Sequence, residues 1–118
     1  RKIAEYAKAV VDGRPCFHIS LVVDVSPFCD CHAENDAPIV PDVGMFASFD
    51  PVALDKACVD AVNAQPVIAD SLLGEAGAHR GDGDYFHAVS PDTNWRSCLE
   101  HAEKIGLGTM DYELVTVK

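Results

Sequence analysis

The first hydrophobic residues of the chain recur with the period of an α-helix. Over residues 3–11 they follow the i, i+3, i+4 spacing that places side chains on one helix face. The apolar set is Ile3, Tyr6, Ala7, Val10 and Val11. Gly13 follows, and glycine is common just past a helix end. The pattern predicts a first helix with one apolar face.

The next hydrophobic run alternates with a period of two, as a β-strand does. In residues 17–25 one side is apolar and carries Phe17, Ile19, Leu21, Val23 and Val25. The opposite side carries His18, Ser20, Val22 and Asp24. This pattern predicts a strand that is largely buried on one face and ends at Ser26 and Pro27.

A second strand is expected over residues 44–49. Residues 26–42, which connect it to the first strand, have no helical pattern, whereas a parallel crossover normally contains a helix. If the two strands are neighbours, they should therefore pair antiparallel.

Two more helices are expected downstream. Asp50 and Pro51 suit the N-cap and the first position of one of them. Its buried face would be Leu54, Ala57, Cys58, Ala61 and Val62. The other begins after Asp92 or Thr93 and buries Trp95, Cys98, Leu99, Ala102 and Ile105. Gly106 is the expected C-cap of that helix, in a Schellman arrangement with Leu107.

The remaining segments complete the predicted fold. Residues 66–91 are rich in Gly and Asp and are expected to be irregular, with a short strand over residues 85–89. A final strand is expected over residues 112–118. Strands and helices interleave, which predicts an α/β (or α+β) class, with a small mixed β-sheet packed with about three α-helices.

The length and the N-terminal sequence bear on the domain organisation. At 118 residues the chain is expected to be a single domain, residues 1–118. It opens in helical rhythm without a starting Met or a signal peptide. We expect it to be the C-terminal part of a longer protein.

The composition narrows the possible partners. Nine basic and nineteen acidic residues give a formal net charge of −10. This charge disfavours a nucleic-acid backbone or an anionic membrane as a partner. The apolar runs are also far shorter than the roughly 20 residues of a membrane helix. We expect no nucleic-acid or membrane partner, and the oligomeric state is left open.

The cysteine pattern indicates a compartment. Five cysteines is an odd number, and their spacing fits no small disulfide scaffold. Without a secretory signal, the reducing cytoplasm is the expected location. The thiols would then be core residues, metal ligands or redox groups.

The loop over residues 26–42 holds the main candidate site. Cys29 and Cys31 are one residue apart, and thiols at that spacing can both face one ion. His32 and Asp42 add a nitrogen and an oxygen donor. We expect a metal site formed by Cys29, Cys31, His32 and Asp42, with a single zinc or iron ion as the candidate metal.

Two long stretches resemble a known family. "CDC" at residues 29–31, "NDAPIVPDVGMFASFDPVALDKACVDAVN" at 35–63 and "NWRSCLEHAEKIGLGTMDYELV" at 94–115 occur in the order seen in the uncharacterised iron–sulfur (Fe–S) centre proteins. This is a domain-of-unknown-function family of bacteria and archaea. The chain resembles its C-terminal part over residues 3–115, nearly the whole chain.

The resemblance implies cofactors and a partner outside these residues. Family members carry upstream ferredoxin-like repeats that bind 4Fe-4S clusters through C-x-x-C-x-x-C-x-x-x-C-P, a pattern that this chain lacks. A 4Fe-4S cluster is thus expected in the full-length family protein but not in this fragment. The implied partner is the upstream cluster-binding domain of the same chain.

The residues leave three functions open. The first is a redox-associated, ferredoxin-associated domain whose Cys-x-Cys loop meets a metal or the upstream cluster. The second is a metal-dependent enzyme domain in which Cys29, Cys31 and Asp42 hold an ion with an open coordination position. The third is a structural domain that uses the loop for docking. No catalytic residue or substrate follows from the sequence.

Other polar clusters have a simpler structural explanation. Asp50 and Asp55 suit the start of a helix, where the dipole favours acids. Asp82 and Asp84 lack the spacing of an EF-hand, and Gly-Asp sequences are common in turns. Cys58 and Cys98 lie on apolar helix faces, where free cysteine is usually a core residue.

Overall fold

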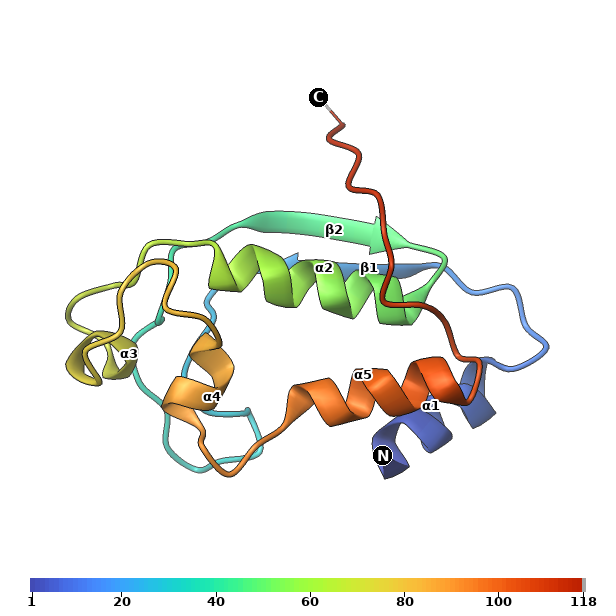
Figure 1. Ribbon diagram of the computed structural model, residues 1–118, viewed down its shortest axis with the longest axis horizontal. Helices are drawn as coiled ribbons and strands as arrows, with labels where there is room; N and C mark the ends of the chain where they lie inside the picture. The colour runs from blue at the N-terminus through green and yellow to red at the C-terminus, as the bar shows by residue number, and fades with distance from the viewer. Residues whose placement is uncertain (118) are drawn as a thin grey trace. The chain divides into compact units, whose positions relative to one another are not determined.

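The computed structural model describes residues 1–117, which form five helices and a two-stranded sheet (Figure 1). The helices are α1 (Lys2–Val11), α2 (Pro51–Asn63), α3 (Leu72–Glu75), α4 (Tyr85–Val89) and α5 (Trp95–Lys104). The strands are β1 (His18–Val22) and β2 (Gly44–Ser48). The predicted α/β class is confirmed.

The sheet has the expected topology. β1 and β2 lie side by side and run in opposite directions (Figure 1). Just past the strands, the Val43 N–H donates to the Val22 carbonyl at 2.8 Å, and Ile39 N–H donates to the Val25 carbonyl at 2.8 Å. The predicted antiparallel pairing is confirmed.

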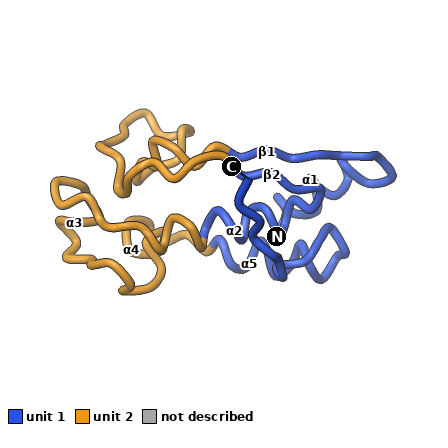
Figure 2. Tube along the Cα trace, turned by 90° about the horizontal axis from the view of Figure 1, so that it is seen from above, with its two compact units in different colours: residues 1–20, 46–59, 95–118 blue, residues 21–45, 60–94 orange. Residues whose placement is uncertain are grey.

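The chain divides into two compact units, coloured separately in Figure 2. Unit 1 contains Arg1–Ser20, Phe46–Val59 and the described residues from Trp95 onward. Unit 2 contains Leu21–Met45 and Asp60–Asn94. Each unit is described below by itself.

The core of unit 1 is built on the contact between α1 and α5. Its buried members are Ala4, Val52, Leu99 and Ala102. Half-buried side chains surround them, namely Trp95, Cys98, Ile105, Leu107 and Met110. The predicted face of α5 is therefore confirmed. Its end is also confirmed, because Leu107 N–H donates to the Ala102 carbonyl and Gly106, at φ +75°, donates to the Glu103 carbonyl.

Helix α1 buries a different face from the apolar one. Ala4 is buried, whereas Ile3, Tyr6 and Val10 are 76%, 72% and 64% exposed. The small side chains of Ala4 and Ala102 allow the two helices to approach closely, which larger residues on the apolar face would prevent. Three of the five residues of the predicted apolar stripe therefore point away from the core of unit 1, while Ala7 and Val11 are half-buried.

The strand β1 likewise buries its more polar side. Phe17 and Ile19 are exposed, and so is Leu21 in unit 2, whereas His18 and Ser20 are half-buried. The Ser20 hydroxyl has a hydrogen-bond partner in the Cys58 thiol of α2, and His18 interacts with the charge of Asp55. Polar partners on α2 thus explain why the polar side faces inward.

Asp50 confirms its predicted role as the N-cap of α2. Its Oδ1 accepts from the N–H groups of Val52 at 2.8 Å and Ala53 at 3.0 Å. Its Oδ2 accepts from Thr109 N–H at 2.9 Å. One carboxylate therefore starts α2 and also holds the segment after α5.

The core of unit 2 surrounds Tyr85. Tyr85 is 1% exposed, and its hydroxyl donates to the Gln65 carbonyl at 3.0 Å. Ile39, Val40 and Leu73 are equally buried. Ile39 ties the end of the 26–42 loop into this core, because its carbonyl accepts from Ile68 N–H at 3.0 Å.

Two predicted strands are wrong. Residues 85–89 form helix α4, because the Asp84 side chain caps it by accepting from Phe86 and His87 N–H. Residues 112–117 form no strand, and Lys118 of that prediction lies outside the described residues. Tyr112 and Leu114 are exposed, so burial does not hold this segment in a sheet.

No helix among residues 1–117 is long and apolar enough to cross a membrane.

Candidate functional site

The candidate site is the loop of unit 2 that carries Cys29 and Cys31. A turn begins at Cys29, whose carbonyl accepts from His32 N–H at 2.9 Å. This hydrogen bond places three candidate ligands, Cys29, Cys31 and His32, on one short turn. All three side chains are exposed, so an ion or a partner can reach them.

Asn35 fixes the shape of this loop. Its side-chain amide donates to Ser26 Oγ at 2.9 Å and to the Phe28 carbonyl at 3.3 Å. Its Oδ1 accepts from Phe28 N–H at 3.4 Å and from Asp36 N–H at 3.0 Å. One side chain thus cross-links both sides of the thiol turn, so the two thiols stand on an organised loop.

The two thiols interact with each other. The backbone N–H and then the side chain of Cys31 hydrogen-bond to Cys29 and lower the pKa of the Cys29 thiol. The same contact raises the pKa of the Cys31 thiol, because Cys31 holds its proton toward the Cys29 sulfur. Cys29 is therefore the thiol that ionises first, and a thiolate is the form that binds metals.

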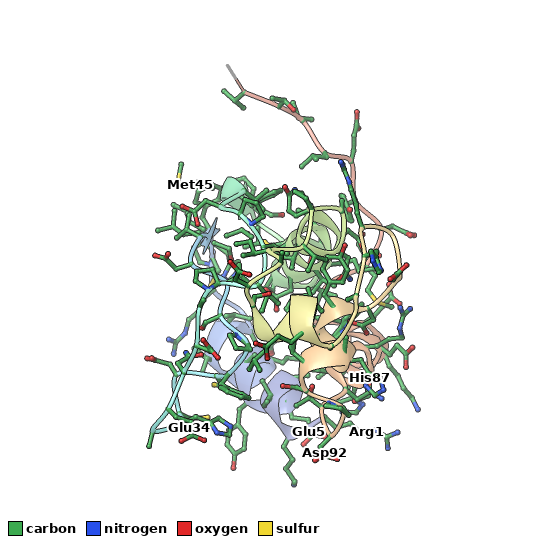
Figure 3. All side chains as sticks on the ribbon, turned by 90° about the vertical axis from the view of Figure 1, so that its left-hand side faces the viewer. Arg1, Glu5, Glu34, Met45, His87 and Asp92 are labelled. Carbon is green, nitrogen blue, oxygen red and sulfur yellow. The ribbon has the colours of Figure 1, made fainter. Side chains whose placement is uncertain are left out.

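His32 is oriented toward acid and aromatic neighbours. Its Nδ1 lies 3.8 Å from Glu34 Oε1, and its ring centroid lies 5.6 Å from that of Phe28. Glu34 lies at the outer edge of the loop (Figure 3). These contacts leave His32 on the exposed side of the turn.

Asp42 has a structural contact that the sequence did not reveal. Its Oδ1 accepts from Asp24 N–H at 2.9 Å, and Asp24 has a φ of +48°. A non-glycine residue with positive φ needs such support. Asp42 therefore has a sufficient role in holding the end of the strand pair.

The predicted ligands do not form one compact cluster. Cys29 and Cys31 are in contact, but across the described residues no three or more His, Cys, Asp or Glu side chains gather as a metal-binding group. A four-iron cluster needs four ligands, usually cysteines. The described residues therefore do not fit such a cluster by themselves.

Sequence reasoning missed Asn35 and Ser26, which shape the loop. The available signal was the string "END" at residues 34–36, since Asn and Asp side chains often bond to nearby backbone in turns. That signal predicts a turn, but it does not show that the turn closes around the cysteines.

Fold and site together define a small α/β protein with an exposed pair of thiols on a structured loop. The family described as Domain of unknown function (DUF362) matches residues 1–60, which include this loop. The chain belongs to that family. No curated protein and no solved structure matches the chain.

Proposed function

We propose that the Cys29–Cys31 turn is a thiolate ligand loop of a redox-associated iron–sulfur protein. Two exposed thiols in mutual contact on an organised turn carry the proposal. Zinc and iron both accept thiolate ligands, and preorganised ligands lower the cost of binding.

This chain supplies an incomplete ligand set. Cys29 and Cys31 provide two sulfur ligands, and His32, on the same turn, is the third candidate. Asp42 already accepts a hydrogen bond from Asp24 N–H, so we do not include it among the proposed ligands. The remaining positions would be filled by the upstream cluster-binding domain, which we propose as the partner in the reducing cytoplasm.

Metal analysis tests the proposal directly. The chain is purified without oxygen and loaded with zinc or ferrous iron, and bound metal is measured with the thermal midpoint. Cys29→Ser together with Cys31→Ser should abolish binding and leave the midpoint nearly unchanged, because both side chains are exposed. Cys16→Ser, which changes a free cysteine of unit 1, is the control and should keep the metal.

Two results would count against a ligand role. One is equal metal content in the double variant and the unchanged chain. The other is a double variant that loses about 1–3 kcal/mol of stability with no change in metal content, since that is the behaviour of structural thiols.

A further inference from the structure

Unit 1 contains a cavity that the thiol loop does not use. Its volume is about 200 Å³, and its wall is formed by the end of α1, the turn that follows, the start of β1, the start of α2 and the segment just after α5. Every residue of the wall belongs to unit 1. At Gly13, whose φ is +70°, no atom lies within 4 Å of the position that a Cβ would take, so the wall is open there.

Basic side chains collect around this cavity. The basic residues Lys8 and Arg14 line it together with the imidazole of His18, against a single acidic lining residue, Asp12. The chain as a whole has nineteen acidic and nine basic residues. Four of those nine basic residues fall within the first fourteen residues, which contain only two acids. The cavity is therefore a local basic site in an acidic protein.

Lys8 already has a structural partner. Its Nζ donates to the Ile105 carbonyl at 2.6 Å, at the C-terminal end of α5. That helix end carries partial negative charge, which would repel an anion. Lys8 offsets this charge, so the wall formed by α5 does not oppose an anionic ligand.

Arg14 has unused donor capacity. Across residues 1–117, the Arg14 side chain has no hydrogen bond, ion pair or ring contact. The Nε2 atom of His18 is buried and has no hydrogen-bond partner in the same described part of the chain. This atom is closed to solvent, so His18 forms part of the wall without reaching a ligand in the cavity.

We propose that this cavity binds a small oxyanion, the carboxylate or phosphate group of a ligand, through Arg14. The planar guanidinium of Arg14 can hold two oxygens of such a group at once. Lys8 adds positive charge from its position on Ile105.

The cavity size limits the ligand. It is smaller than the roughly 300–1,000 Å³ of pockets that enclose drug-sized molecules. It therefore accommodates the charged group and a few further atoms. The apolar part of the wall is Val11, Phe49, Pro51 and Leu107, which suits a short carbon body next to the charge.

An NMR titration of the full chain tests this site. Amide shifts are followed while inorganic phosphate is added at constant pH and ionic strength, and a second arm uses acetate. Saturable shifts centred on Gly13, Arg14 and Gly106 are expected in at least one arm. The arm that saturates at the lower concentration identifies phosphate or carboxylate as the preferred group.

Three variants separate a specific site from general attraction. Arg14→Gln should weaken binding about tenfold, the loss expected for a charge-assisted hydrogen bond. Arg14→Lys keeps the charge without the planar pair of donors and should fall between Arg14→Gln and the unchanged chain. Lys2→Gln is the control, because it removes one charge from exposed Lys2 on α1, outside the cavity wall.

The affinities of Arg14→Gln and Lys2→Gln decide between a specific site and diffuse attraction. A tenfold loss in Arg14→Gln, with less than about a twofold change in Lys2→Gln, supports a site. Equal losses of affinity in the two variants would show that binding depends only on diffuse charge, and would overturn the proposed site. Shifts that rise linearly without saturation in both arms would overturn it as well. Because Arg14 is exposed, its replacement should leave the fold intact. The amide spectrum of the variant without ligand verifies this.

Discussion

At the scale of single residues, Asp50 connects two parts of unit 1. Replacing it by Ala removes three hydrogen bonds, to Val52, Ala53 and Thr109 N–H. An N-cap alone contributes about 1 kcal/mol, so the free energy of unfolding should fall by about 2 kcal/mol. Urea unfolding measures this. Asp92→Ala, at an exposed position, should change it by less than about 0.5 kcal/mol.

Gly108 should be coupled to Asp50. A Cβ at Gly108 would overlap Oδ1 of Asp50, so the carboxylate would have to turn away and release its hydrogen bonds. Gly108→Ala should therefore cost about as much as Asp50→Ala, roughly 2 kcal/mol. The double variant should cost little more than either change alone. Additive losses in urea unfolding would show that the overlap is not with this carboxylate.

The thiol pair predicts a difference in reactivity. The pKa of Cys29 is lowered first by the Cys31 backbone N–H and then by the Cys31 side chain. As pH rises, Cys29 should therefore ionise, and react with iodoacetamide, before Cys31. In Cys31→Ala the backbone donor remains, so the pKa of Cys29 should rise only partway toward its ordinary value.

Peptide mass spectrometry of samples alkylated across a pH series measures both thiols. Cys16→Ala serves as the control and should leave the profile of Cys29 unchanged. Identical profiles for Cys29 in the unchanged chain and in Cys31→Ala would mean that the side-chain contact has no effect in solution.

At the scale of secondary structure, α4 depends on Tyr85. Tyr85→Phe keeps the ring but leaves the carbonyl of half-buried Gln65 without this donor. The free energy of unfolding should fall by about 1–2 kcal/mol. Tyr6→Phe removes the same hydroxyl from a side chain that is 72% exposed and should have almost no effect. Equal effects of the two changes would contradict this role of Tyr85.

The sequence predicted elements better than it predicted their partners. Asp50, Gly106 and the period of α5 depend on neighbours close in sequence, and those predictions are confirmed. The buried face of β1 depended on Ser20 meeting Cys58 and His18 meeting Asp55, which are distant in sequence. Periodicity shows that a strand has two faces, but tertiary contacts choose which one is buried.

The sequence also failed to predict a short helix. Residues 85–89 read as a strand because Tyr, Phe and Val favour strands. The side chain of Asp84 starts a helix there instead. In five residues, one cap outweighs a weak propensity. The cysteines were enough to predict the candidate loop from the sequence. The hydrogen bonds of Asn35 could be identified only from the folded structure.

At the scale of the whole molecule, the burial of the cysteines outside the loop limits cluster binding. Cys16, Cys58 and Cys98 belong to unit 1, and Cys29 and Cys31 belong to unit 2. Burial raises the pKa of Cys58, which favours the thiol over the thiolate that a metal needs. Cys98 packs against the core of unit 1. The loop thus offers two readily available thiols where a four-iron cluster needs four ligands.

We therefore predict that this chain, reconstituted with iron and sulfide without oxygen, holds no stable four-iron cluster. Iron and sulfide analysis after desalting should give far fewer than about four of each per chain, without broad visible absorption. The matched comparison is Cys29→Ser with Cys31→Ser, which removes the thiolate ligands that we assign to a single ion. Loss of a small iron content in that variant fits the ligand loop. About four irons and four sulfides per unchanged chain would instead require cysteines outside the loop to become ligands, although Cys58 and Cys98 are half-buried and Cys98 packs against the core.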